Sequence, residues 1–188
     1  MGKYKYDESR LVFYRTKSGR IACFDPQKRK FNVPKDTHFI PKQMIKNYNP
    51  GKGRVTLATG VNKDCDEARA AEWFLKYFGG DIVVLKTKSD DEENVKQPDF
   101  LINGEYWDLK TNVTPTENAI HNAISKGAKQ IRKDGKPGGL IIDILEKGIR
   151  SDSIISFIIA DKLRQLHISG IFVVVKKGDE IIDVVQKD

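Results

Sequence analysis

Cysteine and histidine are scarce in this sequence. Its 188 residues include two cysteines, Cys23 and Cys65, and three histidines. Neither cysteine has a Cys or His nearby at the spacing that metal sites use, so the cysteines indicate no zinc site. We expect two free thiols in a reducing compartment.

Long hydrophobic runs are also absent. No apolar run approaches the length that spans a bilayer, and the N-terminus lacks the apolar segment of a secretory signal. The sequence shows no internal repeat. Hydrophobic residues make up 39% and charged residues 31%, as in an ordinary globular protein. The length suits one domain, or one catalytic domain with an added N-terminal piece.

Positive charge is concentrated in the first third of the chain. Residues 1–54 hold 14 Lys and Arg against 4 Asp and Glu, whereas residues 55–188 hold 19 against 22. Cations neutralise phosphates, and aromatic faces stack on unpaired bases, so this segment favours a polyanionic partner. A solvated basic surface over a small aromatic core is the alternative. The aromatic residues of this segment are Tyr4, Tyr6, Phe13, Tyr14, Phe24, Phe31, Phe39 and Tyr48.

The apolar patterning predicts an α/β fold, in the form of an α+β mixed sheet with helices packed against it. We expect residues 1–60 to form a basic, β-containing extension that binds nucleic acid, and residues 61–188 to form the main domain. The elements expected in the main domain are helix 65–78, strands 81–85, 99–103 and 105–111, helix 115–133, strand 139–145, helix 152–167 and a strand pair around Lys177-Gly178-Asp179.

Local signals set the expected boundaries of these elements. Gly79-Gly80 should stop the first helix. Thr114 is the expected N-cap of the second helix, with Pro115 at its first position and Glu117 closing a capping box. In the extension, residues 10–25 favour a β-hairpin. The stretch 26–60 should be irregular with short elements at most, and 86–97 should be a charged loop.

Asn103-Gly104 lies between two β-rich runs and predicts a two-residue type I′ turn. That turn sets the register, so Asp99 should face Asp108 across the hairpin. Side chains alternate along a strand, which places Lys110 on the same face as Asp108. Like charges in opposition destabilise a sheet unless something neutralises them. A divalent cation would do so, because carboxylate oxygens are the ligands that Mg²⁺ and Mn²⁺ prefer.

A further carboxylate, Glu67, lies near the middle of the apolar stripe of the first predicted helix. An acid on a core-facing surface costs several kcal/mol unless it is paired or bound to a metal, so Glu67 is a candidate ligand. A capping-box variant, in which Asp64 caps the helix and Glu67 bonds back to the backbone, is equally consistent with this spacing.

The string Gln97-Pro98-Asp99-Phe100, followed after a short hairpin by Asp108-Leu109-Lys110, resembles the PD-X(n)-(D/E)-X-K signature of restriction-endonuclease-like nucleases. Residues 64–145 resemble the αβββαβ core of that superfamily, and most of all the C-terminal nuclease domains of bacterial contact-dependent inhibition and polymorphic toxins. The resemblance does not cover residues 1–58.

The resemblance implies roles for single residues. Asp99, Asp108, Glu67 and the Leu109 carbonyl would bind a divalent metal, with Mg²⁺ preferred and Mn²⁺ or Zn²⁺ as alternatives. Lys110 would orient or activate the attacking water, although a cross-strand salt bridge with Asp108 is the simpler interpretation of the same residue. The family implies an endonuclease that cuts RNA, above all tRNA, in the cytoplasm of a target cell, and a cognate immunity protein.

The helix expected at 115–133 carries the remaining candidates. Lys126, Lys129 and Gln130 are predicted to hold the substrate, and His121 is a candidate general acid. Two other functions stay open on the sequence: a DNA endonuclease of a phage, mobile element or repair system, and a nucleic-acid-binding module without catalysis. Carboxylates that face a phosphate backbone would not help such a module, which argues against the latter.

Overall fold

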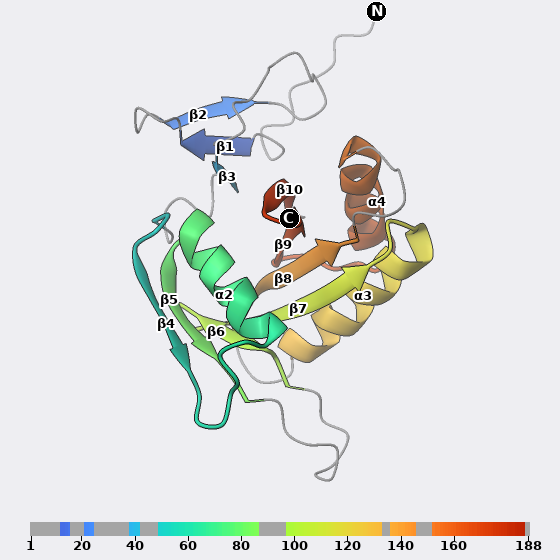
Figure 1. Ribbon diagram of the computed structural model, residues 1–188. Coiled ribbons are helices and arrows are strands. Elements are labelled where there is room, and N and C mark those ends of the chain that lie inside the picture. Colours follow the sequence, from blue (N-terminus) through green and yellow to red (C-terminus); the bar gives the residue numbers. More distant parts are fainter. Residues whose placement is uncertain are drawn as a thin grey trace, which may run out of the picture.

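The computed structural model describes residues 49–86, 97–132, 136–145 and 152–186, and the backbone of 12–15, 21–24 and 38–41 (Figure 1). The helices are α2 (Asp66–Tyr77), α3 (Glu117–Ile131) and α4 (Asp152–Gln165). The strands are β1 (Val12–Arg15), β2 (Ile21–Phe24), β3 (His38–Pro41), β4 (Gly53–Leu57), β5 (Gly80–Val84), β6 (Phe100–Ile102), β7 (Glu105–Val113), β8 (Pro137–Ile144), β9 (Phe172–Lys177) and β10 (Glu180–Gln186).

A seven-stranded mixed sheet forms the centre of the fold, in the order β10-β9-β8-β7-β6-β5-β4. Strands β5, β6 and β7 are antiparallel neighbours, whereas β7, β8 and β9 run parallel. From α2 to β8 the elements follow as helix, three strands, helix, strand. The predicted mixed α/β class and this order of elements are therefore confirmed.

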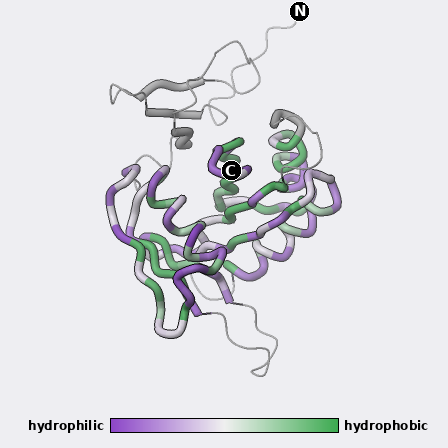
Figure 2. Tube along the Cα trace, viewed as in Figure 1, coloured by the Kyte–Doolittle hydropathy of each residue, from purple (hydrophilic) through white to green (hydrophobic). Residues whose placement is uncertain are grey.

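Helices cover both faces of the sheet (Figure 1). Trp107 and Leu109 of β7 join the core beneath α2. On β8, Leu140 and Ile142 join a second core with α3 and α4. Because Leu140 pairs with Asp108 and Ile142 with Lys110, those two polar side chains share the α3 face. Figure 2 shows the hydrophobic residues gathered along the strands and α4.

Helix α2 ends where the glycine pair predicted. Gly79 has φ +80°, and its N–H bonds to the Leu75 carbonyl at 3.0 Å, as in a left-handed C-cap. A Cβ on Gly79 would lie 1.8 Å from the Asn49 carbonyl oxygen. Only glycine therefore fits, because both its backbone conformation and the close approach of residue 49 exclude a side chain.

The N-terminal caps differ from the prediction. The N-cap of α3 is Thr116, whose hydroxyl accepts from the Ala119 N–H at 3.3 Å, so Thr114 is not the cap and Glu117 is the first helical residue. The cap predicted at Thr114 was therefore wrong by two residues. Strand β7 continues to Val113, so residues 114–116 form the connection from the sheet to the helix. In α2 the N-cap is Cys65, whose Sγ accepts from Ala68 N–H. An Asp64–Glu67 capping box is therefore not formed.

Two features precede the predicted domain boundary. Strands β1 and β2 pair antiparallel, which confirms the predicted hairpin, and β3 joins them in a sheet of order β2-β1-β3. Strand β4 was not predicted, yet it pairs parallel with β5 at the edge of the main sheet. The expected boundary at residue 60 stays a prediction. No helix in the described ranges is long and apolar enough to cross a membrane.

Candidate active site

The Asn103-Gly104 turn determines where the acidic residues lie. Asn103 has φ +49° and Gly104 has φ +79°, which is the backbone of a type I′ turn. Across it Ile102 pairs with Glu105, Leu101 with Tyr106 and Phe100 with Trp107, as predicted. The next positions outward on the two strands are Asp99 and Asp108. The negative charge of Asp108 acts on the Asp99 carboxyl, so the two groups lie close together at the open end of the hairpin.

Asp108 is fully buried, with 0% of its surface exposed. Its Oδ2 forms an ion pair with the Lys110 amine. Helix α3 covers it from above, because a Cβ on Gly127 would lie 3.1 Å from the same Oδ2 and 2.6 Å from a Leu140 methyl. Gly127 thus lets the helix approach the sheet closely enough to enclose the carboxylate. Sequence reasoning missed this residue, although a glycine inside an amphipathic helix is a signal of close packing.

Asp99 is held by the backbone of the opposite strand. Its Oδ2 accepts a hydrogen bond from Leu109 N–H at 2.7 Å. The pKa of Asp99 is raised to about 7, first by burial and then by the negative charge of Asp108, although the Leu109 hydrogen bond and Lys110 act to lower it. A carboxyl with that pKa beside a second buried acid is a place where a cation would relieve repulsion.

Lys110 extends from the same face of β7 and contacts more than Asp108. Its Nζ donates to Gln130 Oε1 at 2.7 Å, and Gln130 Nε2 in turn donates to the Gln97 carbonyl at 3.4 Å. The Lys110 side chain remains 20% exposed. The salt bridge predicted for Lys110 is therefore compatible with the catalytic role predicted for the same amine. That amine lies between a buried acid, an amide and solvent.

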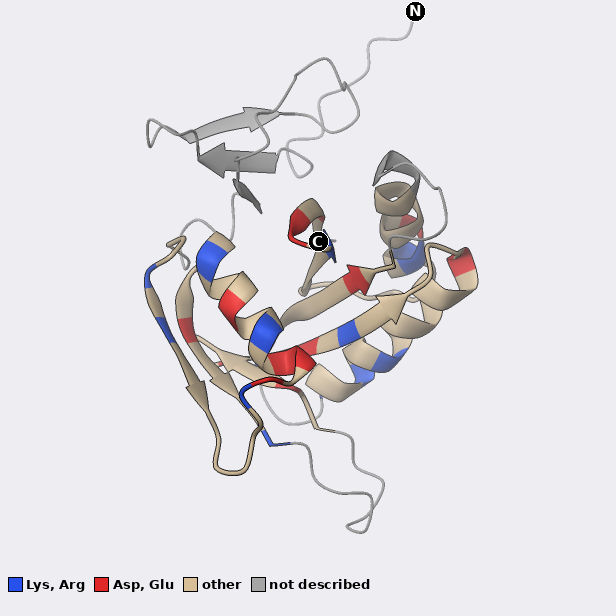
Figure 3. Cartoon of the chain, in the orientation of Figure 1, with Lys and Arg blue, Asp and Glu red and all other residues tan. Residues whose placement is uncertain are grey.

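The donor set suits a hard divalent cation. Asp99 and Asp108 supply carboxylate oxygens that lie close together, which is the chemistry of Mg²⁺ and Mn²⁺ sites. Within the described ranges no group of three His, Cys, Asp or Glu residues is close enough to hold a metal, and the predicted role of Glu67 as a ligand stays a prediction. Glu67 lies in the first turn of α2, whose core is on the other face of the sheet. The acidic start of α2 is visible in Figure 3.

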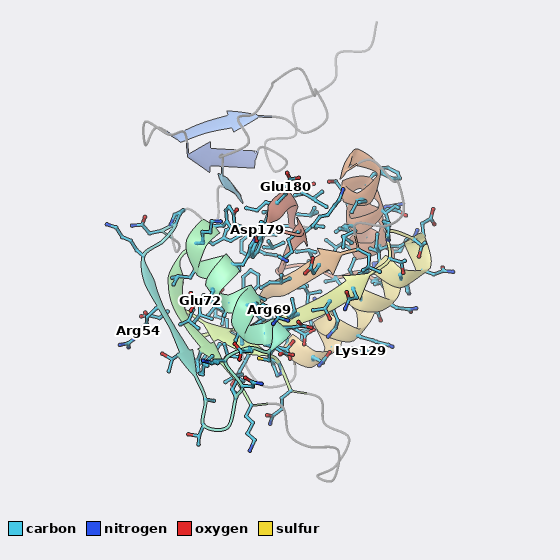
Figure 4. All side chains as sticks on the ribbon, viewed as in Figure 1. Arg54, Arg69, Glu72, Lys129, Asp179 and Glu180 are labelled. Carbon is cyan, nitrogen blue, oxygen red and sulfur yellow. The ribbon has the colours of Figure 1, made fainter. Side chains whose placement is uncertain are left out.

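Helix α3 brings some of the predicted substrate residues to the cluster. Lys126 is one turn before Gln130 on the same flank, and Lys129 is exposed next to it on the outer side of the helix (Figure 4). His121 is nine residues from Gln130, which is two and a half turns of helix. It therefore projects from the opposite flank of α3 and is not brought to Lys110.

The comparisons with known proteins concern the part of the chain that carries this cluster. Residues 96–179 match the family of the contact-dependent growth inhibition CdiA C-terminal domain. The match spans 84 of the 188 residues and includes Asp99, Asp108, Lys110 and all of α3. It confirms the expected likeness to contact-dependent inhibition proteins over this stretch. Membership of the PD-(D/E)XK superfamily stays a prediction.

One solved structure is similar to the chain, the CdiA-CT/CdiI toxin and immunity complex from Burkholderia pseudomallei. It has 17% sequence identity and a TM-score of 0.41, and the alignment covers 70% of this chain and 99% of that chain. No curated protein matches the sequence.

Proposed function

We propose that this protein is a metal-dependent endonuclease of toxin type that cuts RNA, above all tRNA. The observation that carries the proposal is the closeness of the Asp99 and Asp108 carboxyl groups, with the Lys110 amine paired to the second acid and partly open to solvent. The likeness of residues 96–179 to the CdiA C-terminal domain supports the toxin role. Delivery into the cytoplasm of a target cell and a cognate immunity protein belong to the same proposal.

The chemistry follows from the charges. Hydrolysis of a phosphodiester forms a P–O bond to a water oxygen and breaks the P–O bond to a sugar oxygen, which leaves with a proton. A divalent cation would supply a polarised phosphoryl oxygen and an acidified water. Asp99 and Asp108 would hold that cation, and Lys110 would donate a hydrogen bond to a phosphoryl oxygen and offset its growing negative charge.

The substrate is tested by incubating the protein with tRNA and with duplex DNA, each in Mg²⁺, Mn²⁺ or EDTA. We expect cleavage of tRNA that depends on the metal and stops in EDTA. Cleavage of DNA alone would replace the RNA proposal with the DNA endonuclease alternative. Binding of either nucleic acid without cleavage in any metal would indicate a module without catalysis.

The site is tested by Asp108→Asn, which keeps the shape of the side chain and removes its charge. We expect loss of cleavage, by at least ~100-fold, with nucleic-acid binding retained or tighter. The matched control is Asp143→Asn, because Asp143 pairs with Lys176 at 2.8 Å on the opposite face of the same sheet. The control should keep its activity. Undiminished cleavage by folded Asp108→Asn would exclude the proposed site.

A further inference from the structure

Gln130 connects three parts of the candidate site. Its Oε1 accepts from Lys110 Nζ at 2.7 Å, and its Nε2 donates to the Gln97 carbonyl at 3.4 Å. Gln97 lies two residues before Asp99 in the chain. One amide therefore ties α3 both to the amine of β7 and to the segment that leads into Asp99. The side chain is half-buried, so its two hydrogen bonds are partly shielded from water.

The Gln130 contact engages one of the hydrogen-bond donors of the Lys110 amine. A lysine ammonium has three N–H donors and no acceptor. Asp108 takes one donor from the sheet side and Gln130 takes another from the helix side. Asp108 is fully buried, whereas Lys110 keeps 20% of its side chain exposed. With two donors engaged by buried and half-buried partners, the partly exposed amine keeps a third donor for a substrate oxygen.

We propose that Gln130 is a positioning residue for Lys110 and that its carbonyl oxygen, rather than any contact with the substrate, is its contribution. The inference rests on the proposed nuclease function, since it concerns the amine of that site. The role differs from the substrate contact that the sequence predicted for Gln130. It needs a hydrogen-bond acceptor at this distance from Lys110, which the amide oxygen provides.

The two roles predict opposite effects of the same substitutions. Glutamate keeps an acceptor oxygen for Lys110, whereas leucine of similar size keeps none. If Gln130 positions the amine, Gln130→Glu should therefore be much more active than Gln130→Leu. If Gln130 touches a phosphate, Gln130→Glu should be the worse variant, because it sets a carboxylate against an anion.

The experiment measures kcat and KM on tRNA with Mg²⁺ for the full chain and both variants. We expect Gln130→Leu to lower kcat about tenfold with KM within about twofold, and Gln130→Glu to keep kcat within about threefold of the parent chain. The controls are the same changes at Gln165, which accepts from Lys162 at 3.1 Å on α4. They should leave both constants unchanged. A raised KM with unchanged kcat, or glutamate below leucine, overturns the proposal.

A second measurement does not depend on activity. Thermal unfolding of Lys110→Met, Gln130→Leu and the double variant forms a double-mutant cycle. We expect the double variant to melt no lower than the less stable single variant, because the second change removes a contact already lost. Additive losses in melting temperature would show that the two side chains do not support each other. A chain that cuts no nucleic acid would refute the proposed function, while this cycle would still report on the contact.

Discussion

At the scale of single residues, the two facing acids have different surroundings. Asp108 is enclosed by α3 and paired with Lys110, whereas Asp99 bonds to a backbone N–H and lies at the less covered end of the hairpin. Burial and the neighbouring charge make ionised Asp99 unfavourable in the folded chain without metal. The two carboxylates therefore repel each other in the metal-free protein and lower its stability. A bound cation would relieve that repulsion.

Asp99→Asn should reveal that cost as a dependence on pH. The pKa of Asp99 is about 7 in the folded chain against an ordinary value of 3.8, so the folded chain binds the extra proton. The penalty is present above pH 7 and disappears as the pH falls from 7 toward 4. In EDTA at pH 8 the variant should therefore melt higher than the parent chain by ~3 °C or more, and at pH 5 the difference should be clearly smaller.

The control is Asp81→Asn, an exposed acid on neighbouring β5. Its carboxylate remains in water at either pH, so the change in melting temperature should be small and equal at both. An advantage of Asp99→Asn that is as large at pH 5 as at pH 8 would contradict the account of the acid pair.

At the scale of elements, α3 sets the geometry of the site because it carries both Gly127, against Asp108, and Gln130, against Lys110. Where the helix begins determines which residues face the sheet. The start at Glu117 follows from the Thr116 cap, since its hydroxyl satisfies the Ala119 N–H that has no partner within the helix.

Thr116→Ala should lower the free energy of unfolding by ~1 kcal/mol, or a few degrees in melting temperature for a chain of this size. Thr114→Ala is the matched control, because Thr114 contributes its backbone carbonyl to the Thr116 N–H and that bond survives the change. The control should stay within ~0.5 kcal/mol of the parent chain. Urea unfolding of the parent chain and the two variants measures both losses in the free energy of unfolding. A larger loss for Thr114→Ala than for Thr116→Ala would support Thr114 as the N-cap, as predicted from the sequence.

At the scale of the whole molecule, charge is divided between the acid pair and basic residues elsewhere. The chain carries a net charge of +7, and α3, which carries Gln130, also presents the exposed Lys126 and Lys129. A polyanion that approaches this helix would release counterions from its phosphates.

Binding of tRNA should therefore weaken with salt, and the two lysines should contribute to the slope. In EDTA and an Asp108→Asn background, changing Lys126 and Lys129 to Gln should make the slope of log K against log salt shallower by ~1.4 to 1.8. Changing Lys63 and Lys76, near the two ends of α2, removes the same charge and should leave the slope nearly unchanged. Fluorescence anisotropy measures both, and equal slopes for the two double variants would remove α3 from the binding surface.

Short-range sequence signals were sufficient for the hairpin, the facing acids and the order of the core elements. The Asn103-Gly104 turn admits one register, and strand alternation then places Lys110 beside Asp108 whatever surrounds them. Strand β4 was missed because its pairing partner, β5, lies more than twenty residues away and its polar-apolar alternation covers only the four residues 54–57.

The remaining features depended on how α3 docks. Helical periodicity placed Gln130, Lys126 and His121 on one helix, but only packing decided which flank faces the acids and that His121 faces away. The same docking buries Asp108 beneath Gly127. Contacts between residues distant in sequence arise from the shapes of two packed surfaces, and neither surface is encoded in the pattern of one segment.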